Sequence, residues 1–223
     1  MLSRARNPVN PALTTWYSAL PVASLTILFK QDRMPQNKII LASQSPRRIE
    51  LLKQLTSDFD VVPSAIEEIF DPQRTPRENA VALAVEKAQW VARKHKDCFV
   101  IGADTIVVLD DKIIGKPTDK NDAHKILRQL SGREHQVITG LAIVNSIVVK
   151  DAVASTVRFK SLTDDEITRY ISTGEPMDKA GAYAIQGAGA FMISSYQGSY
   201  TNIVGFPLET VRDLLVQAGF RFN

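Results

Sequence analysis

The chain has 223 residues, of which 44% are hydrophobic and 23% charged, an ordinary composition for a globular protein with a sizeable buried core. Residues 1–33 hold four of its 27 bases and one of its 24 acids, so residues 34–223 carry 23 of each. This balance argues against broad nucleic-acid binding. The single cysteine excludes an internal disulfide bond and favours a reducing, cytoplasmic compartment.

The N-terminal 33 residues differ from the rest. Their apolar stretch at 19–29 is short and is interrupted by Pro21, so it is not expected to span a membrane. Two upstream arginines leave a targeting or anchoring segment open as an alternative. We expect residues 1–33 to be an extension outside the fold and residues 34–223 to form one domain.

The first predicted elements are a strand, a helix and a second strand. Residues 38–42 form a short apolar run that is typical of a buried strand. Ser45 followed by Pro46 indicates a helix start, and the apolar spacing extends that helix to about Leu55. Residues 59–62 predict another short strand.

A long helix and a central strand follow. The capping-box sequence at residues 75–78 opens a helix that is expected to run to about Lys96. Residues 98–103 predict a central strand that ends at Asp104, and residues 105–114 predict a hairpin.

The second half mixes the two types of element. A helix is predicted at 121–130, and two β-branched strands at 136–149 and 152–160 are expected to pair antiparallel. A second capping box at 163–166 opens another helix, and the last helix begins near Pro207. This order predicts an α/β fold with a mixed, elongated sheet flanked by helices.

The histidines and the cysteine indicate no metal site of their own. The histidine spacing matches no zinc pattern, so we expect solvated surface side chains at His95, His124 and His135. Cys98 lies in an apolar run and is expected to be a small buried residue.

The segment at residues 43–48 is the first candidate binding site. Free backbone amides where a strand meets a helix start favour an anion, and arginine binds phosphate oxygens well. Ser43, Ser45, Arg47 and Arg48 supply the donors. The alternative is a capped helix with two solvated arginines.

Asp104 is the second candidate. A carboxylate after a buried strand can bind Mg²⁺ or accept a proton from water, although it can also simply end the strand in a turn. Lys87, Lys116 and Glu68 would gain significance only if they gathered around such a site, because each alone is usually a surface charge.

Seven stretches together resemble the Maf family of nucleotide pyrophosphatases, whose fold is related to that of inosine triphosphatases. They are LASQSPRRIELL (41–52), IEE (66–68), AVEKA (84–88), GADTIVV (102–108), GKP (115–117), LSGREHQVITGLAI (130–143) and YAIQGAGAFMI (183–193). They run in family order from Lys38 onward, whereas residues 1–33 match nothing in the family.

The resemblance implies metal-dependent hydrolysis of a nucleoside triphosphate to a monophosphate and diphosphate, with water attacking the α-phosphorus. It implies substrate contacts from Ser43, Arg48, Lys87 and Lys116, and a divalent cation, Mg²⁺ or Mn²⁺, held by Glu68 and Asp104. It also assigns Asp104 the role of proton acceptor. A carboxylate bound tightly to a metal is a weak base, so base and ligand stay alternatives. Relatives are often homodimers, and the same is an expectation for this chain.

Three positions bear on the nucleobase in this family. Arg47, Thr105 and Gln186 resemble the subgroup that prefers dTTP and UTP. A glutamine amide offers a donor and an acceptor to uracil or thymine, whereas an acid at that place would suit a guanine edge. The alternatives are a 7-methylguanosine triphosphate pyrophosphatase of the same family and a non-catalytic nucleotide-binding regulator of cell division. The paired acids Glu68 and Asp104 favour an enzyme.

Overall fold

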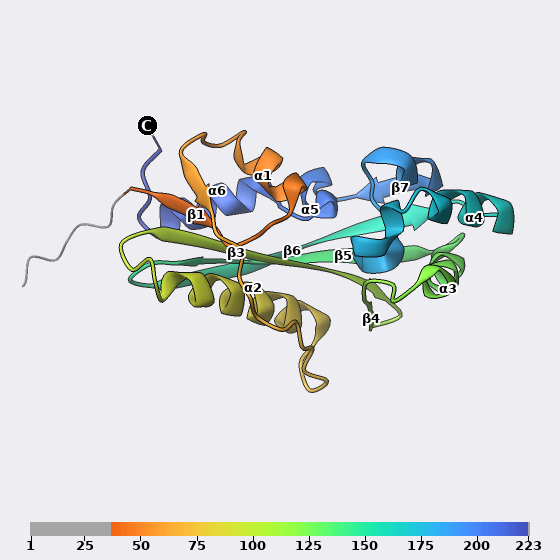
Figure 1. The fold of residues 1–223 in the computed structure, drawn as a ribbon, viewed down its shortest axis with the longest axis horizontal. Helices are drawn as coiled ribbons and strands as arrows, with labels where there is room; N and C mark the ends of the chain where they lie inside the picture. The colour runs from red at the N-terminus through yellow and green to blue at the C-terminus, as the bar shows by residue number, and fades with distance from the viewer. Residues whose placement is uncertain (1–36, 223) are drawn as a thin grey trace, which may run out of the picture. The chain divides into compact units, whose positions relative to one another are not determined.

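The computed structural model describes residues 37–222, and the predicted extension at 1–33 lies outside the described residues. Within that range, seven strands form one mixed sheet (Figure 1). In sheet order they are β2 (Phe59–Val61), β1 (Ile39–Leu41), β3 (Phe99–Leu109), β5 (Glu134–Val144), β6 (Val148–Phe159) and β7 (Ile193–Gln197), with β4 (Lys112–Ile114) paired to β3. β1 is parallel to β2 and β3, and the other pairs are antiparallel.

Helices cover both faces of this sheet. They are α1 (Pro46–Leu52), α2 (Pro76–Ala92), α3 (Lys120–Leu130), α4 (Asp164–Ser172), α5 (Tyr200–Val204) and α6 (Leu208–Gln217). α2 lies on one face, and α1, α5 and α6 lie on the other (Figure 1). The predicted mixed α/β fold is thus confirmed. None of the helices described for residues 37–222 has both the length and the hydrophobicity needed to cross a membrane.

On the face of the sheet opposite α2, the apolar core forms two clusters. Leu52, Phe206 and Leu215 are fully buried between the sheet and the helices α1 and α6. A second cluster, which includes Leu127 and Phe159, lies where α3 and α4 pack at the other end of the long strands. The site described below lies between these two clusters.

α2 packs unusually close to the sheet. Its start is the predicted capping box of Thr75 and Glu78, and it ends at Ala92 rather than near Lys96. Small residues face the strands, and a Cβ added at Gly102 would lie only 2.1 Å from the backbone oxygen of Ala84. A side chain at residue 102 would therefore push α2 away from β3.

The prediction that the central strand ends at Asp104 is wrong, because β3 continues through it to Leu109. The reason is β5, which pairs with β3 continuously from Val100 to Val108. On its other edge β3 pairs with β1 only at 99–101 and with β4 only at 107–109. Among the described strands, none pairs with that edge at residues 102–106, and Asp104 lies at the centre of this gap.

Three further features differ from the sequence-based expectations. The β5–β6 turn lies at 145–147, where the Asn145 side chain accepts a hydrogen bond from the Ile147 amide, rather than at 150–151. α1 ends at Leu52, not near Leu55, and the short α5 was not predicted. His135, expected on the surface, is 3% exposed because it occupies an inward position of β5. Cys98 is buried as predicted.

Candidate functional site

A cavity of about 680 Å³ lies at the gap along β3. Its wall includes the turn between β1 and α1, the middle of β3, the segment after β4, and the segment before β7. All the side chains singled out from the sequence line this one cavity: Ser43, Arg47, Arg48, Glu68, Lys87, Asp104, Thr105, Lys116 and Gln186. The structure therefore brings together residues that lie up to about 140 positions apart in the chain.

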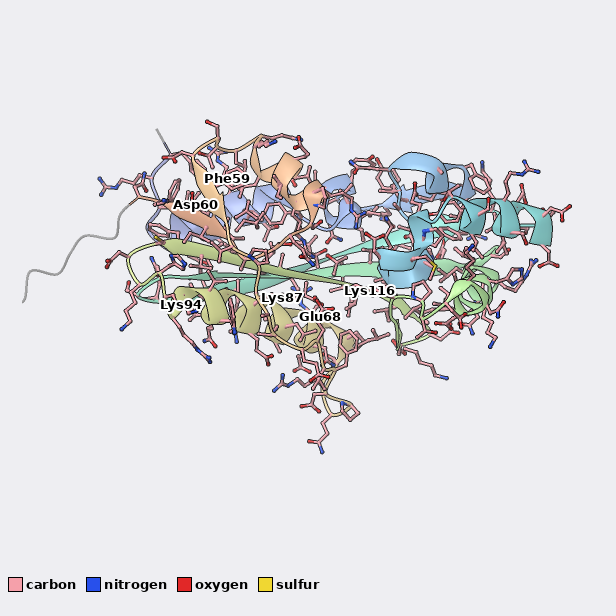
Figure 2. The ribbon with its side chains drawn as sticks, in the orientation of Figure 1. Phe59, Asp60, Glu68, Lys87, Lys94 and Lys116 are labelled. Atoms are coloured by element: carbon pink, nitrogen blue, oxygen red, sulfur yellow. The ribbon has the colours of Figure 1, made fainter. Side chains whose placement is uncertain are left out.

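A chain of ion pairs forms one end of the cavity. Lys87 Nζ lies 2.5 Å from Asp104 Oδ1 and 2.6 Å from Glu68 Oε1, so one ammonium group joins both carboxylates. Lys116 Nζ lies 3.2 Å from Glu68 Oε2. Figure 2 shows the labelled side chains of Glu68, Lys87 and Lys116 in the same region of the molecule.

Burial differs among these charged groups. The Lys87 and Asp104 side chains are 9% and 8% exposed, whereas Glu68 is 38% exposed and reaches solvent. Burial alone would raise the pKa of Glu68, but the hydrogen bonds and charges of Lys87 and Lys116 outweigh it and lower that pKa to about 2. Glu68 is therefore ionised at neutral pH and adds negative charge to the cavity.

Two carboxylates could hold a metal here. No group of three or more His, Cys, Asp or Glu side chains suitable for a metal occurs in residues 37–222. Mg²⁺ in substrate sites needs only one or two protein carboxylates, because phosphate oxygens and water complete its ligand set. Glu68 and Asp104, whose carboxylates are both paired with the Lys87 ammonium group at the cavity wall, fit that donor set.

Arg48 makes more hydrogen bonds within the protein than its predicted role as a substrate ligand implies. Its Nη1 donates to the carbonyl oxygen of Ala103 at 2.8 Å, on the edge of β3 that β1 leaves open, and its Nε donates to Gly205 at 3.0 Å. Its Nη2 donates to the Thr105 hydroxyl at 3.0 Å. The guanidinium thus replaces a neighbouring strand as a hydrogen-bond donor and places a fixed positive charge in the cavity wall. Burial lowers the pKa of Arg48, while the carboxylates of Asp104 and Glu68 oppose that shift.

The Thr105 hydroxyl belongs to the same network. Besides accepting from Arg48, it lies 3.0 Å from the Thr139 hydroxyl and 3.3 Å from the Gly205 carbonyl. Thr105 therefore orients Arg48 within the wall.

The end of the cavity around Lys179 holds a second set of polar groups that the sequence had not indicated. Lys179 Nζ bonds to Asp178 at 2.6 Å, and the Lys179 side chain is only 11% exposed. Burial would raise the pKa of Asp178, but Lys179 and, more weakly, Arg47 lower it, which places Arg47 within electrostatic reach of this end. The sequence signal for Asp178 and Lys179 was weak, because it consists only of two charged residues directly before a run of small residues.

Tyr183 also lines this end and was not predicted. Its hydroxyl lies 2.7 Å from His135 Nε2, and its ring packs edge-on against His135 and Phe159. Gln186, three residues later, is exposed at the cavity. The cavity thus has an ionic end around Lys87 and an end lined by aromatic and amide groups around Gln186.

The sequence model of the family described as Maf-like protein matches residues 38–218 of the chain. The chain belongs to the Maf family. This match covers the described elements from β1 to α6, so every site residue named above lies within the Maf region.

Three curated relatives of this Maf protein share one name. It is 48% identical to the dTTP/UTP pyrophosphatase of Dictyoglomus thermophilum, over 83% of this chain and 98% of the relative. It is 52% identical to that of Syntrophotalea carbinolica, over 81% of this chain and 84% of the relative. For the protein of the same name from Geobacter metallireducens, the identity is 51%, over 81% and 97% of the two chains.

Solved structures show a more distant likeness. The nucleoside-triphosphatase, or dITP/XTP pyrophosphatase, of Mycobacterium abscessus has a TM-score of 0.41 and 15% identity, over 82% of this Maf chain and 97% of that protein. The Ham1 protein of Staphylococcus aureus has a TM-score of 0.42 and 15% identity, over 77% and 85% of the two chains.

Proposed function

We propose that this Maf protein hydrolyses dTTP and UTP to the nucleoside monophosphate and diphosphate. The observation that carries the proposal is the pairing of Asp104 and Glu68 through Lys87 at the gap in β3, inside a cavity large enough for a nucleotide. Support for the substrate comes from relatives about half identical in sequence that are named dTTP/UTP pyrophosphatases.

The triphosphate is assigned to the ionic end of the cavity. Five basic and three acidic side chains line the whole cavity, an excess of two positive charges that suits a polyanion: Arg47, Arg48, Lys87, Lys116 and Lys179 against Glu68, Asp104 and Asp178. Lys116, whose side chain is 56% exposed, can leave Glu68 to reach a phosphate oxygen. The Ser43 hydroxyl and the backbone amides after it add neutral donors at the same end.

Glu68 and Asp104 are the residues that would hold a divalent cation, Mg²⁺ or Mn²⁺. When bound, such a cation supplies positive charge that polarises the phosphate oxygens and neutralises charge on the leaving diphosphate. Lys87 already holds the two carboxylates in place, and it also counters the repulsion between them.

Asp104 is the residue best placed to receive the proton of the attacking water. One of its oxygens is bonded to Lys87, and the other makes no hydrogen bond within the described residues. Water that donates a proton to this second oxygen gains nucleophilicity towards the α-phosphorus. Lys116 then stabilises negative charge as diphosphate departs. A purely ligating Asp104 remains the alternative role for the same side chain.

The nucleobase is assigned to the end around Gln186. The Gln186 amide can pair with both the N3–H and a carbonyl oxygen of uracil or thymine, and Arg47 can donate to a carbonyl. A base with a different edge leaves these groups unpaired, which is how a site built on hydrogen bonds discriminates strongly. Tyr183 supplies aromatic surface at the same end.

Diphosphate release from dTTP, UTP, CTP, GTP and 7-methylguanosine triphosphate, each with Mg²⁺ under one condition, tests the proposal. We expect dTTP and UTP to have the highest kcat/KM. A preference for the methylated guanine nucleotide would refute the base assignment alone. No release from any of the five would refute the enzymatic role and favour a nucleotide-binding regulator.

A further inference from the structure

One carboxylate holds the loop that carries Gln186. Glu175 Oε2 accepts a hydrogen bond from the Ala188 amide at 3.1 Å, and Glu175 Oε1 accepts one from the Gly189 amide at 3.2 Å. Two consecutive backbone donors are thus bound by a single side chain from the segment before the loop. Gln186 lies only two residues before the first of them.

A tyrosine fixes the other end of the same loop. The Tyr170 hydroxyl accepts a hydrogen bond from the Ala184 amide at 3.3 Å and donates one to Glu175 Oε1 at 3.0 Å. Burial, together with Glu175, raises the pKa of Tyr170, so the hydroxyl keeps the proton that it donates. Gln186 therefore lies between two backbone points, at Ala184 and Ala188, that are joined through Tyr170 and Glu175.

The loop closes tightly around this pair. A Cβ added at Gly189 would lie 2.5 Å from the backbone oxygen of Ala184 and 2.9 Å from the Tyr170 hydroxyl. Glu175 is itself held, because its amide donates to the Thr173 hydroxyl and its carbonyl oxygen accepts from Lys179 Nζ at 2.8 Å. These contacts thus connect Glu175 to Lys179, which lines the cavity.

We infer that Glu175 is a positioning residue for nucleobase discrimination, acting through Gln186. Neither Glu175 nor Tyr170 is among the residues that line the cavity, so any effect on the base must pass through the loop. Hydrogen bonds weaken steeply when their angles change, so an amide that reads a base edge must be held in a narrow range of positions. The inference rests on the proposed function, because it assigns the cause of that enzyme's base preference.

The test compares dTTP with dCTP, which share the sugar and the triphosphate and differ at the pairing edge of the base and in the 5-methyl group. Glu175→Gln keeps the shape of the side chain but replaces one acceptor oxygen with a donor, so at least one of the three groups that donate to Glu175 loses its acceptor. We expect the ratio of kcat/KM for dTTP to that for dCTP to fall about tenfold. Tyr170→Phe, which removes only the hydroxyl, should shift the ratio in the same direction. Asp165→Asn, an exposed acid in the first turn of α4, is the matched control and should leave the ratio unchanged.

A double-mutant cycle separates positioning from a general loss of structure. If Glu175 acts through Gln186, then adding Glu175→Gln to the Gln186→Ala variant should not change the dTTP to dCTP ratio of kcat/KM any further. The inference is overturned if Glu175→Gln leaves the ratio of the wild type intact, or if it lowers the ratio equally in both backgrounds. Failure of the proposed function shows itself differently, as a wild-type protein that releases no diphosphate from either nucleotide.

Discussion

Asp104 and Glu68 both pair with Lys87. Because Lys87 keeps one partner when the charge of Asp104 is removed, the chemical role of Asp104 can be tested without loss of the fold. In Asp104→Asn the shape of the side chain is kept and Lys87 retains Glu68 at 2.6 Å, so the fold should survive. Turnover should fall by roughly 10²- to 10⁴-fold, the usual contribution of a positioned proton acceptor. Steady-state kinetics and thermal melting of one preparation measure both effects.

Asp110→Asn, at the β3–β4 turn, is the control and should leave turnover unchanged. Near-normal turnover of Asp104→Asn would make Asp104 structural.

Lys87 should be more important for stability than Asp104. Its ammonium group is the partner of a buried and a half-exposed carboxylate, so Lys87→Met leaves both without their shared cation. Breaking a buried ion pair by removing one partner costs about 3 kcal/mol or more. We expect chemical denaturation to show a loss of that order together with loss of activity. A variant as stable as the wild type would show that the carboxylates do not depend on Lys87.

His135 predicts a dependence of stability on pH. Burial lowers the pKa of His135 to about 4, against 6.5 for an ordinary histidine. Between these values the unfolded chain binds a proton that the folded chain does not, so the stabilisation is complete above about pH 6.5 and is lost as the pH falls towards 4. At about pH 5 the loss should be about 2 kcal/mol. Denaturant unfolding at about pH 7.5 and pH 5 measures it, with His135→Gln as the control that lacks the titrating ring. An equal loss in both proteins would contradict the assignment.

The ionic end of the cavity depends on the close packing of α2, which carries Lys87, against β3, which carries Asp104. Gly102→Ala places a Cβ where the backbone oxygen of Ala84 lies, so α2 must shift and carry Lys87 away from Asp104. Overpacking of this kind costs about 1–3 kcal/mol. We expect both stability and turnover to fall. Gly115→Ala, where an added Cβ meets nothing within 4 Å, is the control for stability. Unchanged turnover in a destabilised Gly102→Ala would show that the distance from Lys87 to Asp104 is not critical.

Elements with strong local patterns could be predicted from the sequence, whereas pairings set by distant strands could not. The capping boxes at Thr75 and Thr163 were predicted correctly, because their hydrogen bonds are local. The continuation of β3 through Asp104 was missed, since it depends on β5, more than 30 residues later in the chain. The burial of His135 was missed for the same reason: its partner, Tyr183, comes from another segment. Residues 43–48 and Asp104 were indicated by their places at a helix start and after a buried strand, and the family resemblance connected the other predicted site residues to them. Lys179 and Tyr183 needed the fold.

At the scale of the whole molecule, we propose that residues 34–223 form the folding and catalytic unit. The family match begins at Lys38 and the first described strand at Ile39. A protein that begins at Met34 should therefore keep the melting temperature and kcat/KM of the full chain, as compared by thermal melting and kinetics side by side. A marked loss of either would show that residues 1–33 contribute to the fold or the site.

In the proposed reaction, water attacks the α-phosphorus of a nucleoside triphosphate held in the cavity at the gap in β3. Hydrolysis of dTTP in water labelled with heavy oxygen, followed by mass spectrometry of the products, tests it most directly. We expect dTMP and diphosphate, with the label in dTMP and almost no product from Asp104→Asn. Formation of dTDP and orthophosphate, or of label in the diphosphate, would contradict it.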